Sequence, residues 1–133
     1  MNSSATRLGA ALLPLLLLSA CAGLKASEEA PYTGTIFSAG GLHPVTTVFT
    51  TDARDATVGR YVFEEDGGTK VPGTLGPCEV RASGALRCEW HDRYGRGYFF
   101  ATFSPDRRRF QGHWGSGDLL RSTSVEGIWN GER

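Results

Sequence analysis

The chain separates into an uncharged apolar run near its start and a long stretch in which apolar and polar residues alternate. Leu8 to Leu18 carries no charge, whereas apolar and polar residues alternate from residue 32 onward in short runs bounded by Gly, Asp, Ser and Pro. A period of two is typical of β-strands with one buried face. Nine strands are predicted, at 32–37, 45–50, 57–64, 69–75, 77–81, 85–91, 97–104, 109–114 and 125–130. Their regular spacing predicts an all-β fold, an antiparallel meander of about eight or nine strands closing into a small barrel or sandwich.

The apolar run has the layout of a cleaved signal peptide. Arg7 is the only charge before it, and eleven residues are too few to span a bilayer of about 30 Å. The run ends in Leu18-Ser19-Ala20-Cys21, which resembles the lipobox of bacterial lipoproteins. The resemblance implies cleavage before Cys21, lipidation of its thiol and sorting to the outer membrane. The alternative is an ordinary signal peptide. We expect residues 1–20 to be the signal, 21–31 a flexible lipidated tether and 32–133 the β domain.

Cysteine counting fits the same interpretation, since an exported protein with three cysteines leaves one unpaired. If Cys21 carries lipid, Cys78 and Cys88 remain to form a disulfide in an oxidising compartment. The register implied by this disulfide pairs Val80 with Leu86, Glu79 with Arg87 and Gly76 with Trp90. It joins opposite charges and places a Gly beneath a large ring.

A second hairpin is expected around the turn 105–108. Its register pairs Phe103 with Phe110, Ala101 with Gly112 and Phe99 with Trp114. These partners share one apolar face, whereas the other face carries polar side chains. The hairpin therefore has one buried and one solvated face.

A pattern with Gly between two larger residues, each two positions away, recurs in the β domain. It occurs at Tyr32-x-Gly34-x-Ile36, Thr57-x-Gly59-x-Tyr61, Val71-x-Gly73-x-Leu75, Phe110-x-Gly112-x-Trp114 and Val125-x-Gly127-x-Trp129. An inward Gly lets a strand bend and lets a neighbouring aromatic ring lie over the backbone. The hairpins of residues 95–133 resemble Gly/aromatic repeats of uncharacterised bacterial envelope proteins and, more loosely, MORN repeats. They are also similar in style to avidin and lipocalin barrels, which implies an eight-stranded barrel and transfers no ligand residue.

Charge excludes one class of partner and suggests another. The balance of 14 basic and 14 acidic side chains argues against a nucleic-acid binder. The charges are unevenly placed, because residues 21–77 carry four basic and seven acidic side chains and residues 78–133 carry nine and seven. A candidate basic rim for anionic lipid or an acidic partner consists of Arg93, Arg96, Arg107, Arg108 and Arg109. The alternative is a solvated face of mixed charge.

The sequence offers no recognisable catalytic or metal-binding set. The three histidines, at 43, 91 and 113, lack the local spacing of a metal pair. Three carboxylates, Asp92, Asp106 and Glu126, would form a catalytic pair only if the fold brought them together. We therefore expect no enzymatic activity, metal or cofactor.

Large aromatic side chains dominate the predicted inward rows. They are Tyr61, Phe63, Trp90, Phe99, Phe103, Phe110, Trp114 and Trp129. They either fill the barrel interior or line a pocket for an apolar ligand. The first hypothesis is thus a membrane-anchored, non-catalytic envelope lipoprotein that acts as an interaction or structural module for an envelope protein. The second is a lipocalin-like or avidin-like binder of a small apolar ligand, and the third is an inhibitor of a lysozyme-type periplasmic enzyme.

Overall fold

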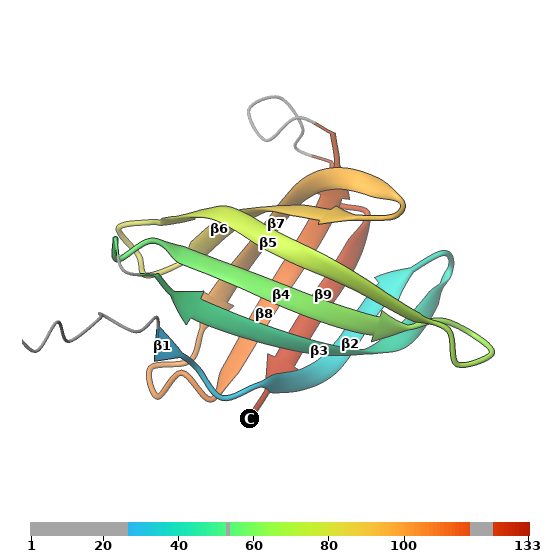
Figure 1. The fold of residues 1–133 in the computed structure, drawn as a ribbon, viewed down its shortest axis with the longest axis horizontal. Coiled ribbons are helices and arrows are strands. Elements are labelled where there is room, and N and C mark those ends of the chain that lie inside the picture. The colour runs from blue at the N-terminus through green and yellow to red at the C-terminus, as the bar shows by residue number, and fades with distance from the viewer. Residues whose placement is uncertain (1–26, 53, 118–123) are drawn as a thin grey trace, which may run out of the picture.

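The computed structural model describes residues 27–52, 54–117 and 124–133, and these form a closed antiparallel barrel (Figure 1). A two-residue strand, β1 (Ser27–Glu28), precedes the barrel. The barrel strands are β2 (Tyr32–Ser38), β3 (Gly41–Thr51), β4 (Thr57–Glu64), β5 (Lys70–Val80), β6 (Leu86–Asp92), β7 (Gly95–Phe103), β8 (Arg109–Ser116) and β9 (Gly127–Glu132). Each pairs with the next along the chain, and β9 pairs with β2. The predicted meander is confirmed, and its closure makes it a barrel rather than a sandwich. Within the described ranges, no helix has the length and apolar character needed to span a membrane.

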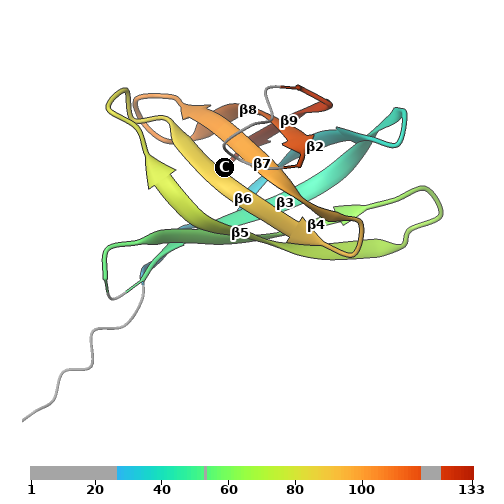
Figure 2. The ribbon, with the colours of Figure 1, turned by 90° about the horizontal axis from the view of Figure 1, so that it is seen from above.

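The up-and-down order of the strands gives the barrel two distinct ends. One end, which we call the closed end, contains β1, Arg133 and the turns 52–56, 81–85 and 104–108. The other end, which we call the open end, contains the turns 39–40, 65–69 and 93–94 and the described residues that flank the β8–β9 connection. Figures 1 and 2 show the strands winding around one common interior between these ends.

Aromatic side chains fill the middle of this interior. The ring centroid of Phe99 lies 4.6 Å from that of Trp129, 5.8 Å from that of Phe110 and 6.3 Å from that of Phe49. All four side chains are almost fully buried. Every inward aromatic predicted from the sequence belongs to this core or packs against it. Phe103 and Trp114 are the two that pack against it as partly buried side chains. The barrel therefore has a packed centre rather than a lipocalin-like central cavity.

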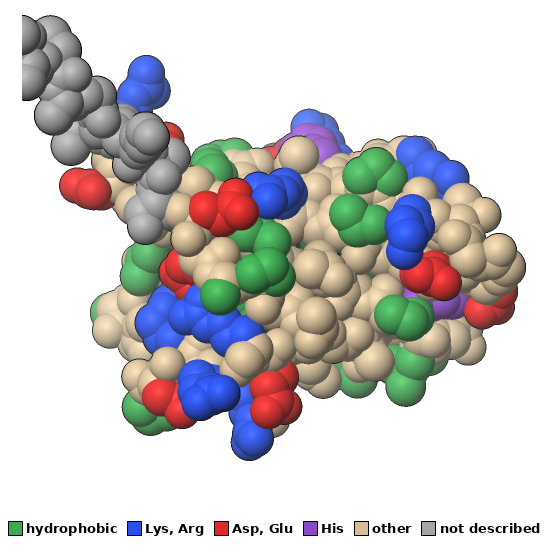
Figure 3. Space-filling model, turned by 60° about the horizontal axis from the view of Figure 1, so that its bottom comes forward, with side chains coloured by type: hydrophobic (Ala, Val, Ile, Leu, Met, Phe, Trp, Pro, Cys, Tyr) green, Lys and Arg blue, Asp and Glu red, His purple; other side chains and the backbone are tan. Residues whose placement is uncertain are grey.

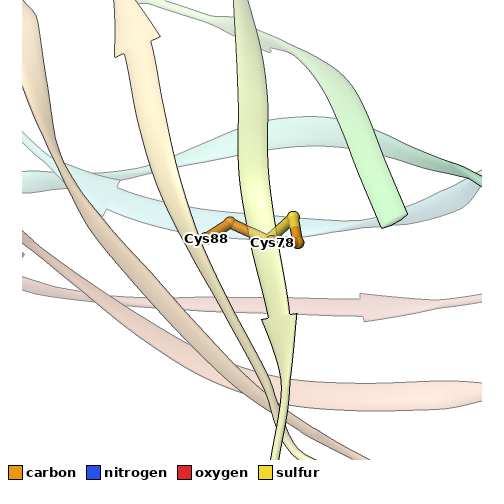
Figure 4. Close-up of a disulfide and its surroundings, with 2 residues drawn as sticks. All are labelled: Cys78 and Cys88. Carbon is orange, nitrogen blue, oxygen red and sulfur yellow. A yellow bond between two sulfur atoms is a disulfide. The ribbon is translucent and has the colours of Figure 1, made fainter. Parts of the chain in front are cut away.

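Both predicted hairpin registers are largely confirmed. Phe103 lies opposite Phe110, and Cys78 lies opposite Cys88, to which it is joined by the predicted disulfide between β5 and β6 (Figure 4). The predicted pairing of Gly76 with Trp90 is wrong, because a β-bulge between Leu75 and Cys78 shifts the register and Leu75 takes that place. Pro77, which lies in the bulge, has no N–H to donate to the ladder.

Two predicted boundaries also change. The runs 69–75 and 77–81 are one strand, β5, since the bulge bends the strand without ending it. The expected tether, 21–31, overlaps the folded domain, because β1 pairs with β3 and the N–H of Glu29 donates to Phe49 O at 2.9 Å. The described fold therefore begins at Ser27 rather than at Tyr32.

A candidate binding cleft at the open end

A small cleft of about 60 Å³ opens at the open end of the barrel. Its lining consists of Ile36, Ser38, Tyr61, Phe63, Trp90, Asp92, Tyr94, Trp114 and Trp129. We call it the mouth cleft. Six of the nine residues are aromatic and only one is charged, so the cleft is an apolar recess with a single carboxylate at its edge.

The strand pattern brings these rings together. Inward residues of β4, β6, β8 and β9 alternate with outward ones, so each strand contributes rings near its open-end half. The rings of Trp90 and Trp114 stand 5.6 Å apart at 88°, and those of Tyr61 and Trp129 stand 4.6 Å apart at 75°. Such edge-to-face pairs stabilise each other and form perpendicular walls.

The indole N–H groups of the cleft are all used to hold these walls in place. Trp90 Nε1 donates to Gly115 O at 3.0 Å, and Trp114 Nε1 donates to Phe37 O at 2.9 Å. Trp129 Nε1 donates to Thr47 Oγ1 at 3.1 Å. The indole polar atoms are therefore occupied. Because Trp90 and Trp129 are almost fully buried, the most accessible rings of the cleft are those of Trp114 and Tyr94.

Asp92 supplies the only charge among the described residues of the cleft lining. It is the last residue of β6, two positions after Trp90, so strand alternation turns it to the same side. Its Oδ2 accepts a hydrogen bond from the Tyr61 hydroxyl at 2.8 Å, and its Oδ1 accepts one from the Tyr94 N–H at 2.8 Å. Burial, followed by the hydrogen bond and charge of Asp92, raises the pKa of Tyr61 well above its usual value, so this hydroxyl stays a neutral donor.

A second polar cluster lies beside the cleft. The Tyr94 hydroxyl donates to Glu65, and the Arg93 guanidinium contacts both Glu65 and the Tyr94 hydroxyl. These bonds, led by that from Tyr94, lower the pKa of Glu65. The Arg93 guanidinium also lies 4.9 Å from the centroid of the Tyr94 ring. The cluster holds Tyr94 beside the cleft and pairs the charge of Arg93 with Glu65.

The structure divides the predicted basic rim between the two ends of the barrel. Arg93 and Arg96 flank the β6–β7 turn at the open end, whereas the β7–β8 turn carries Arg107, Arg108 and Arg109 to the closed end. The five arginines therefore do not form one rim, because β7 runs the length of the barrel between the two groups. Figure 3 shows Lys and Arg side chains gathered toward the side where the described chain begins, with acidic side chains among them.

At the closed end the arginines cover the core and pair with acids. Arg107 and Arg133 each contact Glu29 at 3.0 Å. The Arg133 guanidinium lies 4.6 Å from the centroid of the Tyr32 ring, and that of Arg107 lies 4.4 Å from the centroid of the Phe103 ring. Arg107 and Arg133 therefore cover the closed end of the aromatic core and are paired with Glu29, so they do not form a uniform positive surface.

The candidate catalytic carboxylates are divided between the two ends of the barrel. Asp106 lies in the β7–β8 turn at the closed end, whereas Asp92 and Glu126 lie at the open end. Glu126 accepts a hydrogen bond from Ser116 Oγ at 2.6 Å, and Asp92 is held by tyrosines. Across the described ranges there is no cluster of three or more His, Cys, Asp or Glu side chains arranged to hold a metal ion.

The alternation of apolar and polar residues predicts the ring walls of the cleft, but the prediction above does not include the carboxylate in the same site. Because Trp90 belongs to the inward row, the period of two turns Asp92 inward as well, so the sequence contains this signal. Tyr94 lies in a turn, outside the strand period, and no pattern predicted its position over the cleft.

Comparisons of this chain with protein-family models, with curated proteins and with solved structures found no match.

Proposed function

We propose that the protein is a lipid-anchored lipoprotein of the bacterial envelope, held by Cys21, whose barrel is a non-catalytic binding domain. The observation that carries this proposal is the sequence Leu18-Ser19-Ala20-Cys21 directly after an uncharged apolar run. These residues lie outside the described ranges. The Cys78–Cys88 disulfide supports the same compartment, because disulfides persist where the surroundings are oxidising.

The anchor position has a consequence for orientation. Six residue steps separate Cys21 from Ser27, and a fully extended chain of that length reaches at most about 20 Å. Since Ser27 lies at the closed end, an anchored barrel has its closed end near the bilayer and its mouth cleft directed away. Arg108, whose Nε donates to Arg133 O, lies on the membrane-proximal side in this arrangement. Basic side chains there favour contact with anionic lipid headgroups.

A substitution at Cys21 tests the anchor. We expect Cys21→Ser to abolish incorporation of a radiolabelled fatty acid and to shift the protein from the membrane fraction to the soluble fraction. The matched control is the Cys78→Ala, Cys88→Ala double variant, which keeps Cys21 and should keep both label and membrane association. Equal labelling and distribution of the wild type and Cys21→Ser would refute lipidation at this residue.

A second function, the binding of a small ligand, is favoured by the mouth cleft. The packed centre of the barrel supports neither a long acyl chain nor a bulky cofactor inside it, whereas the cleft offers a recess of about 60 Å³ with a directed carboxylate. Concave, mostly apolar sites with a few oriented polar groups are typical ligand sites. Retention or titration of small ligands by the purified protein tests this function independently of the anchor.

A further inference from the structure

The mouth cleft combines aromatic walls with a carboxylate that is held by neutral donors. Asp92 accepts hydrogen bonds from the Tyr61 hydroxyl and the Tyr94 N–H, each at 2.8 Å. Among the ion pairs of the described residues, none includes Asp92. Two neutral donors orient a carboxylate without cancelling its charge. Its negative charge therefore acts on whatever enters the cleft.

The rings provide the second half of a cation site. The face of an aromatic ring carries negative charge density and attracts a cation within about 6 Å of the ring centroid, most strongly for Trp. Six aromatic rings line the cleft, and those of Trp114 and Tyr94 are its most accessible ones, so a small group inside it contacts these two rings with the buried rings behind them. Aromatic walls on several sides are the arrangement by which proteins bind quaternary ammonium groups.

Charges around the cleft favour a cation as well. The open end carries five acidic side chains and three basic ones among the residues that the structure describes, namely Glu64, Glu65, Asp66, Asp92, Glu126 and Lys70, Arg93, Arg96. Two of the three cations are paired, since Lys70 contacts Glu64 at 2.9 Å and Arg93 contacts Glu65. The described residues of the open end therefore carry a net negative charge around the cleft.

The size of the cleft restricts the ligand to a small head group. About 60 Å³ is several times the roughly 10–15 Å³ that must be open to admit one water molecule, so the cleft admits a group of a few heavy atoms. A trimethylammonium or similar alkylated ammonium group, with about five heavy atoms, has this size and needs no hydrogen-bond acceptor beyond a nearby negative charge. We propose that the mouth cleft binds a small organic ammonium ion, its alkyl groups against the aromatic rings of the lining and its charge beside Asp92. This inference rests on the ligand-binding function proposed above and not on the lipid anchor.

Two other occupants fit the observations less well. A neutral apolar group would cover the Asp92 carboxylate without compensating the lost hydration, which is costly for a charge. A hydrated metal ion prefers several oxygen ligands, whereas the lining offers one carboxylate and mainly carbon. An alkylated ammonium ion satisfies both the apolar walls and the charge.

The protein contains an internal reporter for this site. All three tryptophans of the chain, Trp90, Trp114 and Trp129, line the mouth cleft. The full-length lipoprotein, purified in a maltoside detergent, is titrated with choline chloride at constant ionic strength kept with sodium chloride. Phosphocholine detergents are avoided because their head groups carry trimethylammonium. We expect saturable quenching or a spectral shift of tryptophan fluorescence, with a millimolar or tighter dissociation constant.

The neutral isostere of choline, 3,3-dimethyl-1-butanol, separates charge from shape. Because it has the same outline without the charge, we expect it to bind at least about tenfold more weakly than choline. Equal binding of the two compounds would overturn the proposal in favour of an apolar ligand. Absence of any saturable signal with choline would overturn it as well.

Matched variants test the role of Asp92. Asp92→Asn should weaken choline binding by about tenfold or more while leaving binding of the neutral isostere unchanged. The control, Asp66→Asn, removes one acid from the same end of the barrel at a side chain that does not line the cleft, and should change affinity by less than about twofold. Trp114→Leu, which removes a partly buried ring of the cleft, should also lose choline binding. Because this variant lacks one of the fluorescent reporters, its binding is measured by ligand-observed NMR of the choline methyl signal. Similar losses in Asp92→Asn and Asp66→Asn would refute a specific site.

Failure of this proposal and failure of the anchor are distinguishable. Choline binding is measured in detergent, where membrane attachment has no part, and Cys21→Ser should bind choline as the wild type does. Thermal melting of each variant confirms that the barrel is intact before affinities are compared. A correctly folded Asp92→Asn variant that binds choline with wild-type affinity would refute the inference.

Discussion

The contact between Tyr61 and Gly73 offers a sharp test of how the barrel core supports the cleft. The two residues lie directly opposite each other on β4 and β5, and the Tyr61 ring lies over the Gly73 backbone. A Cβ added at Gly73 would lie 2.2 Å from Cζ of Tyr61 and 2.4 Å from its hydroxyl oxygen. Ordinary carbon contacts need about 3.5–4 Å, so the ring would have to move by more than about 1 Å.

The ring has little room to move. On one side it packs against Trp129 with centroids 4.6 Å apart, and its hydroxyl is fixed to Asp92 at 2.8 Å. Overpacking of a core costs about 1–3 kcal/mol, and loss of a hydrogen bond to a charged group costs about 1.5–3 kcal/mol. Movement of the ring relieves the overpacking but breaks the hydrogen bond to Asp92, so the two free-energy costs do not add in full. We expect Gly73→Ala to destabilise the protein by about 2–4 kcal/mol.

Urea unfolding of the full chain in maltoside, followed by far-UV circular dichroism, measures this loss. The matched control is Gly41→Ala, because an added Cβ there comes no closer than 3.6 Å to another side chain. We expect the control to stay within about 0.5 kcal/mol of the wild type. A Gly73→Ala variant as stable as Gly41→Ala would show that the ring is not held as described, and the packing argument would be wrong.

Two further predictions concern the disulfide and the tyrosines. Replacing Cys78 and Cys88 together by Ala should cost about 3 kcal/mol in urea unfolding, because the disulfide closes a short loop of the unfolded chain; an unchanged midpoint would refute its stabilising role. Burial is the main reason for the raised pKa values of Tyr32, Tyr61 and Tyr98, so near-ultraviolet absorbance should show all three still protonated as the pH passes the ordinary tyrosine pKa of 10.0. Since folding favours the neutral phenols, the stability they contribute is fully present below pH 10 and is lost as the pH rises through their raised pKa values. Ordinary titration of all tyrosines in the folded protein would contradict this burial.

The sequence predicts the barrel well where short turns fix the register. Phe103 lies opposite Phe110 because the turn 105–108 leaves only one alternation that buries both rings. The shift at Gly76 and Pro77 differs from the prediction because the predicted register assumes uninterrupted pairing, whereas the bulge adds one residue between Leu75 and Cys78. A turn signal of Gly and Pro therefore split β5 into two strands that the structure joins.

Closure of the sheet is a long-range property that no local pattern specifies. The pairing of Ile36 with Trp129 joins β2 to β9 across most of the domain. Its indirect signal is the Gly pattern, since small inward residues allow strong curvature, as where the Trp90 ring lies over Gly97. The sequence thus favoured a curved sheet but left barrel and sandwich open.

The candidate site shows the same division between local and long-range information. Strand alternation identifies the inward rings, and the meander order alone separates Arg93 from Arg107, because consecutive turns of an up-and-down sheet lie at opposite ends. The prediction of one basic rim grouped them by distance along the chain and was misled for that reason. Convergence of Asp92 with rings from three other strands depends on closure and twist, so it required the structure.

The residues of the cleft are also residues of the core, and this couples ligand binding to the stability of the barrel. Tyr61, Trp90 and Trp129 belong to the buried cluster and line the recess with the same rings. A ligand that binds only the folded state stabilises it by RT ln(1 + [L]/Kd), about 2.7 kcal/mol at one hundred times Kd. A substitution that loosens the core, such as Gly73→Ala, therefore also displaces the hydroxyl that orients Asp92. Arg107 and Arg133 cover Phe103 and Tyr32 at the closed end of the core, whereas the recess lies at the open end, away from the proposed membrane anchor.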